Sequence, residues 1–416
     1  MPRITRRALL AAVAGLSFHP RLLSAQARRA PKRSVLSVNL RSPEMRPVSV
    51  ETPTTYELTL PLEADASALR IGLGNITPTP YRLGGICVSQ SDGWQPKTAP
   101  GWVYPSFSSQ KASSPDRSAP GPWPVEVPGN SKNATGATNV PTIIWSDWID
   151  YETHATERPQ LVLRALIPVQ TLPMVAAGGL EGRVDDPVTG KARLIGERCL
   201  PGDYVTDPKT PLPSPQSTPF APIFAIQYRI AVPGVQIVIG GDSHLAAWTT
   251  FIQLAAWELS HPTRPIAVWN AAWGGQPSNT FWPCLDEAIF ETQPSICVIQ
   301  GWTANDGMNP IADNAYLDRV RESVRRTVQS GAIPIIVKGL PRDLFGKPEL
   351  VSWLQINKEL DLLSSQALVF DPDPYVEDPT RAGNWLPQYS RDAIHASFAG
   401  NQDLAQPFER LLEPLL

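Results

Sequence analysis

The sequence predicts an α/β fold class: a parallel sheet covered by helices on both faces, preceded by a β-sandwich-like part. Three observations lead to this prediction. Residues 28–232 show strand-like alternation and almost no helical periodicity, whereas short apolar runs alternate with helical stretches over residues 233–416. Proline accounts for 45 of the 416 residues. This is about twice the usual ~5%, which disfavours an all-helical protein because proline fixes φ and lacks an N–H donor.

The first 27 residues are typical of a targeting segment. A basic start with Arg6 and Arg7 precedes an apolar run at 8–18 and an A-x-A cleavage pattern at 25–27. The run is too short to cross a bilayer, which needs about 20 apolar residues. The adjacent arginines resemble a twin-arginine signal, with an ordinary secretory signal as the alternative. We therefore expect residues 1–27 to be removed on export to the periplasm or the exterior.

The charge balance narrows the choice of partners. The formal net charge is -3, and removal of four arginines with the leader leaves 32 − 39 = −7. A mildly acidic chain disfavours nucleic acid or an anionic lipid surface as the main partner. No stretch after the leader is long and apolar enough to predict a membrane anchor.

Four cysteines remain after the leader, two in each half of the chain: Cys87, Cys199, Cys284 and Cys297. Export permits disulfides, and four cysteines allow three connectivities. The simplest expectation pairs them within each half, as 87–199 and 284–297. Cys297 lies in an apolar run, so a buried thiol is the alternative there. No C-x-x-C occurs and the cysteines are not interleaved with histidines, so no metal site is expected.

Strand signals dominate the β-rich part. Three segments have the alternation of strands, at 69–73, 160–166 and 224–232. Tracts dense in Pro, Gly, Ser and Asn lie at 100–141 and 207–219 and predict long loops. A β-sandwich with long excursions is the simplest account of this pattern.

The α/β part alternates apolar runs with helical stretches. The runs lie at 235–239, 265–269, 296–300, 333–337 and 367–370, and the helical stretches include 245–260, 314–330, 350–365 and 401–415. This alternation predicts a parallel sheet with helices on both faces. The functional site of such a sheet forms at the carboxyl ends of its strands.

Polar residues follow three of these runs and recur near the C-terminus. They lie at 240–244, 270–275, 301–306 and 391–397. Each segment alone is a common turn or surface pattern, but together they contain a serine, a histidine, a carboxylate and an amide. A nucleophilic serine needs a base, an orienting group for the base, and donors for the oxyanion. These four segments supply all of those parts.

Histidine is scarce, which narrows the choice of base. The chain has five, at positions 19, 154, 244, 261 and 395. His244 is adjacent to Ser243, and neighbouring side chains at a turn diverge, so His244 is a poor proton acceptor for it. His19 leaves with the leader, and His154 and His261 lie in polar or proline-flanked connections. His395 is therefore the remaining candidate base, and Asp392 three residues earlier can bind its second ring nitrogen.

These segments resemble the sequence blocks of the SGNH or GDSL-type hydrolases. Residues 241–243 match Gly-Asp-Ser of the first block, with His244 in place of the usual Leu or Ile. Residues 270–275 resemble the second block and 392–395 match the last. Residues 303–306 resemble the third block, G-x-N-D, with Thr303 where glycine is usual. The resemblance covers residues 235–416, and residues 69–94 loosely resemble a β-rich segment that precedes the catalytic domain in some members.

The resemblance implies a flavodoxin-like three-layer α/β/α sandwich and ester hydrolysis without metal or cofactor. It assigns Ser243 as nucleophile, His395 as general base and Asp392 as its orienting carboxylate. The oxyanion hole would comprise the N–H groups of Ser243 and Gly275, with Gly274 as the alternative glycine, and the side chain of Asn305.

The expected activity is that of an exported serine esterase acting on short acyl esters, acetyl above all. The substrate would be a small-molecule or carbohydrate ester. Trp273 and Trp302 stand next to the oxyanion segments, and we expect at least one of them to contact substrate, with core packing as the alternative. Other functions compatible with the sequence are an O-acyltransferase acting on cell-envelope glycan and a non-catalytic glycan-binding protein.

Overall fold

A computed structural model describes the chain from residue 29 to 416, except for 40–44, 76, 91–101, 109–123, 131–139, 152–159, 177–181, 186–191, 209–222, 247–249, 307–309, 344–345 and 391. The expected leader, residues 1–27, lies outside the described residues. Within the described ranges, no helix has the length and apolar character that a membrane crossing needs.

Five parallel strands form the sheet of the α/β part. In spatial order they are β15 (Ile266–Asn270), β14 (Ile223–Gly240), β16 (Ile296–Gln300), β17 (Ile333–Val337) and β18 (Leu368–Phe370). Numbered along the chain, this is the order 2-1-3-4-5 of flavodoxin-like sheets. All residues of β15 and β16 are buried, as expected of strands with helices on both faces. The predicted α/β class is confirmed.

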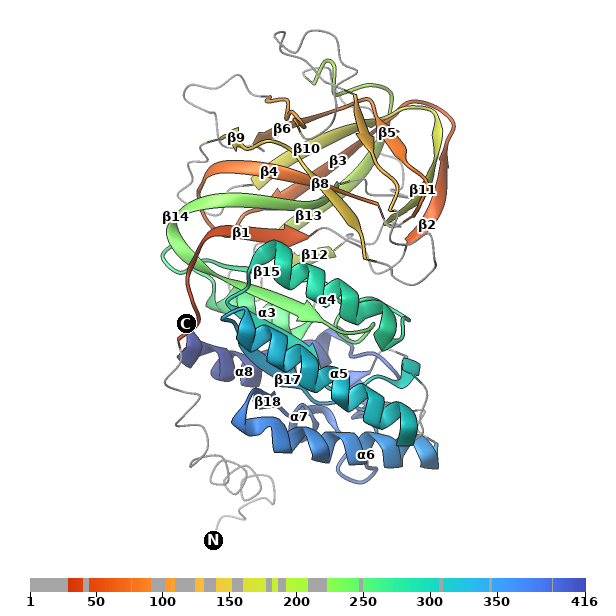
Figure 1. Ribbon diagram of the computed structural model, residues 1–416, viewed down its shortest axis with the longest axis vertical. Coiled ribbons are helices and arrows are strands. Elements are labelled where there is room, and N and C mark those ends of the chain that lie inside the picture. The colour runs from red at the N-terminus through yellow and green to blue at the C-terminus, as the bar shows by residue number, and fades with distance from the viewer. Residues whose placement is uncertain are drawn as a thin grey trace.

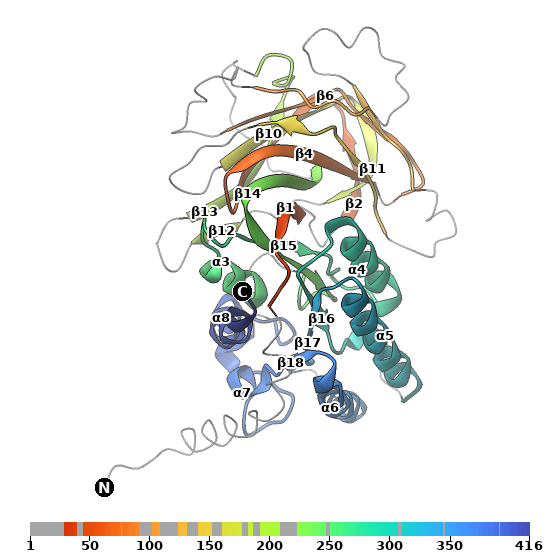
Figure 2. The ribbon, with the colours of Figure 1, turned by 60° about the vertical axis from the view of Figure 1, so that its left-hand side comes forward.

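Helices cover both faces of this sheet (Figure 2). On one face lie α3 (Phe251–Leu259) and α8 (Phe398–Leu412); on the other lie α4 (Ser278–Thr292), α5 (Pro310–Gln329) and α6 (Lys347–Asp361). Each side has its own hydrophobic core. The result is a three-layer α/β/α sandwich.

Helices α5, α6 and α8 begin three or four residues earlier than predicted, and two other helices differ more. The helix expected from residue 245 begins at Phe251, because Thr250 caps it by accepting the N–H of Gln253. Helix α4 was not predicted, since Pro283 lies inside it and its first turn holds poor helix formers. Its buried residues recur at helical spacing and include Phe281, Leu285 and Ala288.

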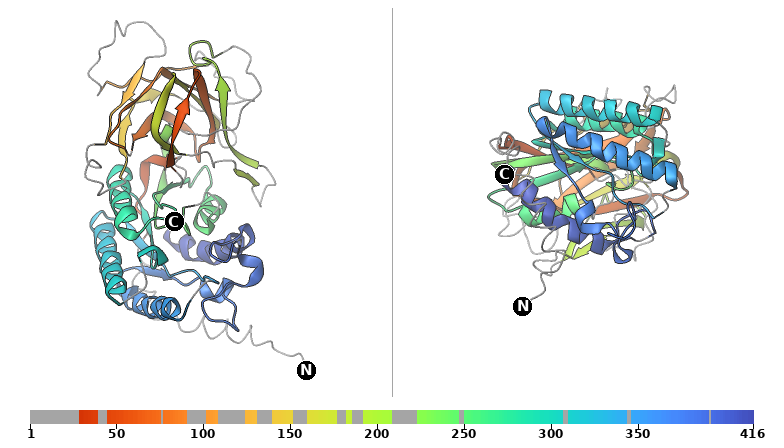
Figure 3. Two further views of the ribbon diagram at one scale, coloured as in Figure 1. Left: turned by 90° about the vertical axis from the view of Figure 1, so that its right-hand side faces the viewer. Right: turned by 90° about the horizontal axis from the view of Figure 1, so that it is seen from below.

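Two β-sheets stack face to face in the β-rich part, above the α/β part (Figures 1 and 3). One contains β12 (Gly182–Asp185), β13 (Ala192–Pro201), β3 (Thr54–Pro61), β10 (Gln160–Ile167) and β6 (Gly85–Gln90). The other contains β1 (Arg33–Asn39), the first half of β14, β4 (Ala66–Asn75), β8 (Thr142–Trp145) and β9 (Ile149–Asp150). Short ladders join β2 (Met45–Val50) to β11 (Gln170–Ala176) and β5 (Tyr81–Leu83) to β7 (Val125–Val127). Leu58 and Leu161 of one sheet share a buried core with Ile71 and Ile226 of the other, as in a β-sandwich.

Strand β14 belongs to both parts of the molecule. Its first half pairs antiparallel with β1 and β4, and its last residues pair parallel with β15 and β16. Gly234 lies at the change of partners, where a Cβ atom would come within 2.5 Å of the Pro265 carbonyl oxygen. The boundary expected between residues 232 and 233 therefore falls inside one continuous strand.

The four cysteines are buried free thiols, so the expected disulfides are not formed. Cys87 on β6 and Cys199 on β13 are separated by β10 and β3. Three strand spacings amount to about 14 Å, whereas a disulfide needs Cα atoms within about 7 Å. The Cys284 Sγ donates to the Thr280 carbonyl 3.5 Å away, and burial raises the pKa of the Cys297 thiol to about 12.

A cluster of carboxylates follows β18. Lys338 pairs with Asp371 at 2.9 Å, and the N–H of Asp373 donates to Asp371. Burial, together with the nearby charges of Asp371 and Glu377, raises the pKa of Asp373 to about 9. The folded chain therefore keeps a proton on Asp373 that the unfolded chain releases above about pH 4. Stability is accordingly lost as the pH rises from about 4 to about 9.

Replacing this carboxyl should remove that loss. Asp373→Asn should raise the free energy of unfolding by about 1–3 kcal/mol at pH 8 and leave it nearly unchanged at pH 4. Thermal melts of both proteins from pH 4 to 9 measure this difference, with Asp318→Asn, whose side chain is 75% exposed, as the control. Parallel stability curves for Asp373→Asn and the wild type would contradict the prediction.

Candidate active site

The serine lies in the turn that follows β14. Leu245 N–H donates to the Asp242 carbonyl at 3.1 Å, which closes the turn around the partly exposed Ser243. Gln300, at the end of β16, accepts the Asp242 N–H at 2.7 Å. Only glycine fits at Gly241, since a Cβ atom there would lie 2.3 Å from the Gln300 Oε1. The turn is thus held against the neighbouring strand.

The structure brings the predicted serine, histidine and aspartate together. His395 Nε2 lies 2.8 Å from Ser243 Oγ, and His395 Nδ1 lies 2.8 Å from Asp392 Oδ2. Because an ionised carboxylate only accepts, Nδ1 carries the ring proton, which leaves Nε2 free to accept the hydroxyl proton of Ser243. We call the hydrogen-bonded series Ser243–His395–Asp392 the relay. Because the His395 side chain is 24% exposed, the relay is open to solvent on one side.

Asp392 is held ionised by its own loop. Burial alone would raise the pKa of Asp392, but the N–H and ring of His395 and the N–H of Ile394 hold it well below its usual range. These N–H groups donate to Asp392 Oδ1 at 2.7 and 3.1 Å. Ala393, between Asp392 and Ile394, adopts the left-handed conformation with φ 66°, which costs about 1–2 kcal/mol in a non-glycine residue.

The loop after β17 supports this segment. Asp343 accepts the Trp385 N–H at 2.8 Å and donates its own N–H to the Ala393 carbonyl at 2.8 Å. The fully buried Trp385 indole donates to the Ile394 carbonyl at 3.2 Å. The aspartate–histidine segment is therefore fixed from two sides, although it contains no helix or strand.

Asp242, beside the serine, is a buried carboxylate with three donors. It is 2% exposed and accepts the Thr303 hydroxyl at 2.5 Å, the His244 N–H at 2.9 Å and the Asn305 amide at 3.3 Å. Thr303 Oγ1 also accepts the Asn305 N–H at 3.2 Å. The threonine that replaces the usual glycine of the third block thus ties that loop to the serine turn.

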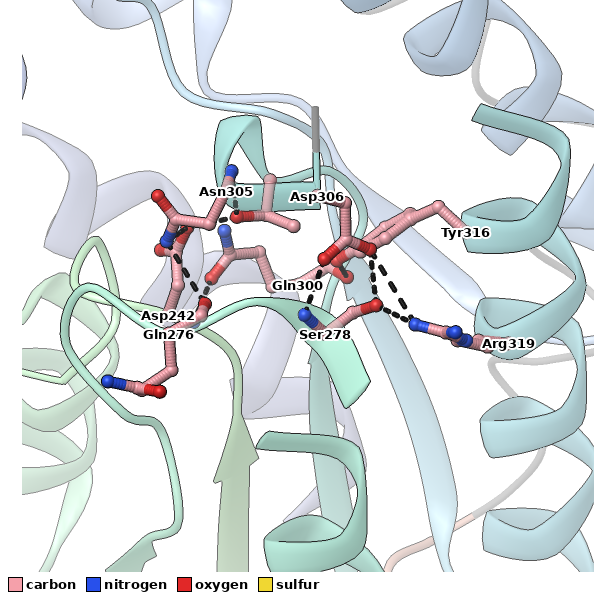
Figure 4. Close-up of polar contacts among 9 residues, drawn as sticks. Asp242, Gln276, Ser278, Gln300, Asn305, Asp306, Tyr316 and Arg319 are labelled. Carbon is pink, nitrogen blue, oxygen red and sulfur yellow. Dashed lines mark hydrogen bonds and ion pairs between the residues drawn. The ribbon is translucent and has the colours of Figure 1, made fainter. Parts of the chain in front are cut away.

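The three predicted oxyanion donors differ in whether they already make hydrogen bonds. The N–H groups of Ser243 and Gly275 make no hydrogen bond to another described residue, and Gly275 is exposed with φ 67°. The Asn305 amide is engaged: besides Asp242 it donates to the Gln276 carbonyl at 3.0 Å (Figure 4). An oxyanion would compete for the longer of these two bonds, the one to Asp242.

A polar brace that the sequence did not reveal fixes the loop containing Gly275. Asp306 accepts the N–H of Ser278 at 2.6 Å and also its hydroxyl, and Arg319 Nη1 lies 3.7 Å from the same carboxylate (Figure 4). Ser278 is the first residue of α4, so this contact fixes the end of the loop that precedes the helix. In the sequence, Asp306 is notable only as the last residue of the segment 303–306 that resembles G-x-N-D.

His244 lies next to the relay without joining it. Its ring centroid is 5.3 Å from that of His395, and its Nδ1 is buried with no partner among the described residues. Burial lowers the pKa of His244, and the nearby His395 and Arg342 lower it further against the opposing effect of Asp242. The ring that contacts Ser243 Oγ is therefore that of His395 and not that of His244.

The expected substrate contact by tryptophan does not fit the structure. Trp273 and Trp302 are 4% and 3% exposed and belong to the core beneath α4, α5 and α6, together with Trp353. The Trp302 indole N–H lies 3.4 Å from the Ser352 hydroxyl oxygen. Burial to this extent favours the core-packing alternative for both rings.

The described residues contain no group of three or more His, Cys, Asp or Glu side chains arranged to hold a metal ion. The chemistry that the site offers is proton transfer and nucleophilic attack by Ser243.

Comparisons place this chain beside known structures. No protein-family model matches the sequence, and no curated protein matches it. Similar solved structures include a member of the lipolytic protein G-D-S-L family from Veillonella parvula DSM 2008, at 13% identity and TM-score 0.35, covering 42% of this chain and 96% of that one. An acetyl xylan esterase is similar at 12% identity and TM-score 0.37, over 43% of this chain and 100% of its own. The aryl esterase of M. smegmatis is similar at 15% identity and TM-score 0.34, over 44% and 100%.

The tautomer of His395 is open to direct measurement. The Asp392 contact should keep the proton on Nδ1, whereas Asp392→Asn presents an amide N–H that favours protonation of Nε2 instead. Imidazole ¹⁵N chemical shifts distinguish the two forms. Asp378→Asn, in the same loop region but bonded to Thr380, is the control and should leave the shifts unchanged. An Nδ1-protonated ring in Asp392→Asn would contradict the assignment.

Proposed function

We propose that this chain is a serine hydrolase of the SGNH or GDSL type that cleaves carboxylic esters. The observation that carries the proposal is the relay from Ser243 through His395 to Asp392, with 2.8 Å at each contact. It lies at the carboxyl ends of a flavodoxin-like parallel sheet, where the fold places functional sites. The ionised Asp392 fixes the tautomer in which His395 accepts a proton from the serine.

The reaction follows from this geometry. Ser243 Oγ attacks the acyl carbon while its proton moves to His395 Nε2, and the carbonyl electrons form an oxyanion. When the tetrahedral intermediate collapses, the alcohol leaves with the proton from His395 and the acyl group remains on Ser243. Water then attacks the acyl carbon while its proton moves to His395 Nε2, and when this second tetrahedral intermediate collapses, His395 returns the proton to Ser243 Oγ, which releases the acid and restores the serine hydroxyl. Asp392 stabilises the imidazolium in both halves of the reaction.

Stabilisation of the oxyanion would come from three donors. The unbonded N–H groups of Ser243 and Gly275 are available to it, and the Asn305 amide would exchange its 3.3 Å bond to Asp242 for a bond to the charged oxygen. Removing one such donor typically lowers kcat by about 10²–10³.

Ser243→Ala should lower the hydrolysis of p-nitrophenyl acetate by at least about 10³ because triad members act as a unit. The melting temperature should change little, since the side chain is partly exposed. The rate is measured in a preparation shown to be free of wild-type enzyme. Comparable hydrolysis by the variant would refute the proposed site.

We further propose short acyl esters, acetyl above all, of a small molecule or carbohydrate as the substrate, met after export. The polar His244 follows Ser243 in the chain and the Asn305 amide bonds Asp242 before it, and polar groups at this place suit a polar alcohol better than a long acyl chain. The mild net negative charge favours a neutral polysaccharide over an anionic lipid surface. Adding a glycan acceptor to the assay tests for acyl transfer in place of hydrolysis.

A p-nitrophenyl ester series tests the acyl length. Acetyl or propionyl esters should exceed chains of about eight carbons by at least about tenfold in kcat/KM, or ~1.4 kcal/mol. Because Trp302 is buried in the core, Trp302→Ala should destabilise the fold by about 3–5 kcal/mol and leave the chain-length profile of the folded fraction unchanged. An optimum at long chains in the wild type would refute the short-acyl proposal.

A further inference from the structure

Strand β1, the first described strand of the chain, ends beside the carboxyl end of β15 in the α/β part. Its last residue, Asn39, is 1% exposed. Asn39 Oδ1 accepts the Asn270 N–H at 2.7 Å, and Asn39 Nδ2 donates to the Asn270 carbonyl. One side-chain amide thereby satisfies both backbone polar groups of a residue 231 positions away.

A second amide fastens the same strand. Gln236, on β14, accepts the Ser37 N–H at 2.7 Å and donates to the Ser37 carbonyl at 3.0 Å. This pair repeats the Asn39 pattern two residues earlier along β1. The hydrogen bonds of Gln236 to described residues reach Ser37, Ser295, Ile237 and Ala267, none of which belongs to the serine turn.

Asn270 connects the first clamp, which is the pair of hydrogen bonds made by the Asn39 side chain, to the turn that contains Ser243. It ends β15, and its side chain is bonded through both polar atoms: Nδ2 donates to the Leu245 carbonyl at 2.7 Å, and Oδ1 accepts the Ala272 N–H at 3.0 Å. Leu245 closes the turn that holds Ser243. Ala272 begins the segment that leads to Gly275. A single buried asparagine thus holds both the serine turn and the oxyanion loop.

We propose that Asn39 is a positioning residue for Ser243, so that the β-rich part of the chain completes the active site of the α/β part. This inference rests on the proposed function. Without Asn39, the backbone N–H and carbonyl of Asn270 would be buried without partners, at a cost that backbone rotation would relieve. Such a rotation moves the Asn270 side chain and releases the Leu245 carbonyl.

Matched variants separate positioning from simple stabilisation. Asn39→Leu keeps the shape of the side chain and removes both hydrogen bonds, and Gln236→Met removes the neighbouring clamp. Both should lower the melting temperature. Only Asn39→Leu should lower kcat for p-nitrophenyl acetate, by about tenfold with KM within about twofold, while Gln236→Met should keep kcat within about twofold. Asn39→Asp retains the acceptor for the Asn270 N–H and, because burial keeps its carboxyl protonated, a donor for the Asn270 carbonyl, so it should show a smaller loss, about threefold.

Deuterium exchange supplies a readout that does not need activity. Residues 240–246 should exchange faster in Asn39→Leu than in the wild type, whereas Gln236→Met should not change them. If Asn39→Leu does not fold, Asn39→Asp decides by the same two measurements.

An unchanged kcat together with unchanged exchange, or an equal loss of kcat in Gln236→Met, would overturn the inference. A wild type that hydrolyses no ester would instead refute the proposed function, and exchange at 240–246 would still test the positioning.

Discussion

The backbone ladder of β14 is the interaction on which the rest of the structure depends. Its 18 residues form antiparallel bonds to β1 and β4 and then parallel bonds to β15 and β16. The same strand thus carries part of the core of the β-rich sandwich and the centre of the parallel sheet, and it ends at the serine turn. Because one continuous ladder joins the two parts, the geometry of the β-rich part is transmitted directly to the edge of the sheet where the site lies.

Beyond the ladder, the site is fixed by buried polar contacts between loops that lie far apart in sequence. Asp242 accepts donors from its own turn and from the loop after β16, and Asn270 links the serine turn to the loop after β15. A buried carboxylate or amide is costly unless all its partners are present, so each bond favours one arrangement of the loops. These contacts hold Ser243 in place, and Asp343 and Trp385 hold the segment of Asp392 and His395, although all three residues lie outside helices and strands.

The loops after β15 and β16 have an apolar side, which contains Trp273 and Trp302, and a polar side. Trp273 and Trp302 project into the core beneath α4–α6, while the polar Gln276 and Asn305 lie on the side of the serine turn. The aromatic residues therefore anchor the loops in the core, while the Asn305 amide bonds Asp242 in the serine turn. Adjacency in sequence to oxyanion residues predicted the opposite for the tryptophans, because successive side chains of a loop point in different directions.

The sequence by itself determined the alternation of strands and helices after residue 233, the sandwich-like pattern before it, and the identity of Ser243, His395 and Asp392. These follow from local periodicity, from a short motif after a strand and, for His395 and Asp392, from the scarcity of histidine and the resemblance to a family block. Only the tertiary structure decided the continuity of β14, the separation of Cys87 from Cys199, the engaged state of the Asn305 amide and the contact of Asn39 with Asn270. The reason is physical: these features depend on strand pairing and side-chain bonds between residues far apart in the chain, whose register no local pattern specifies.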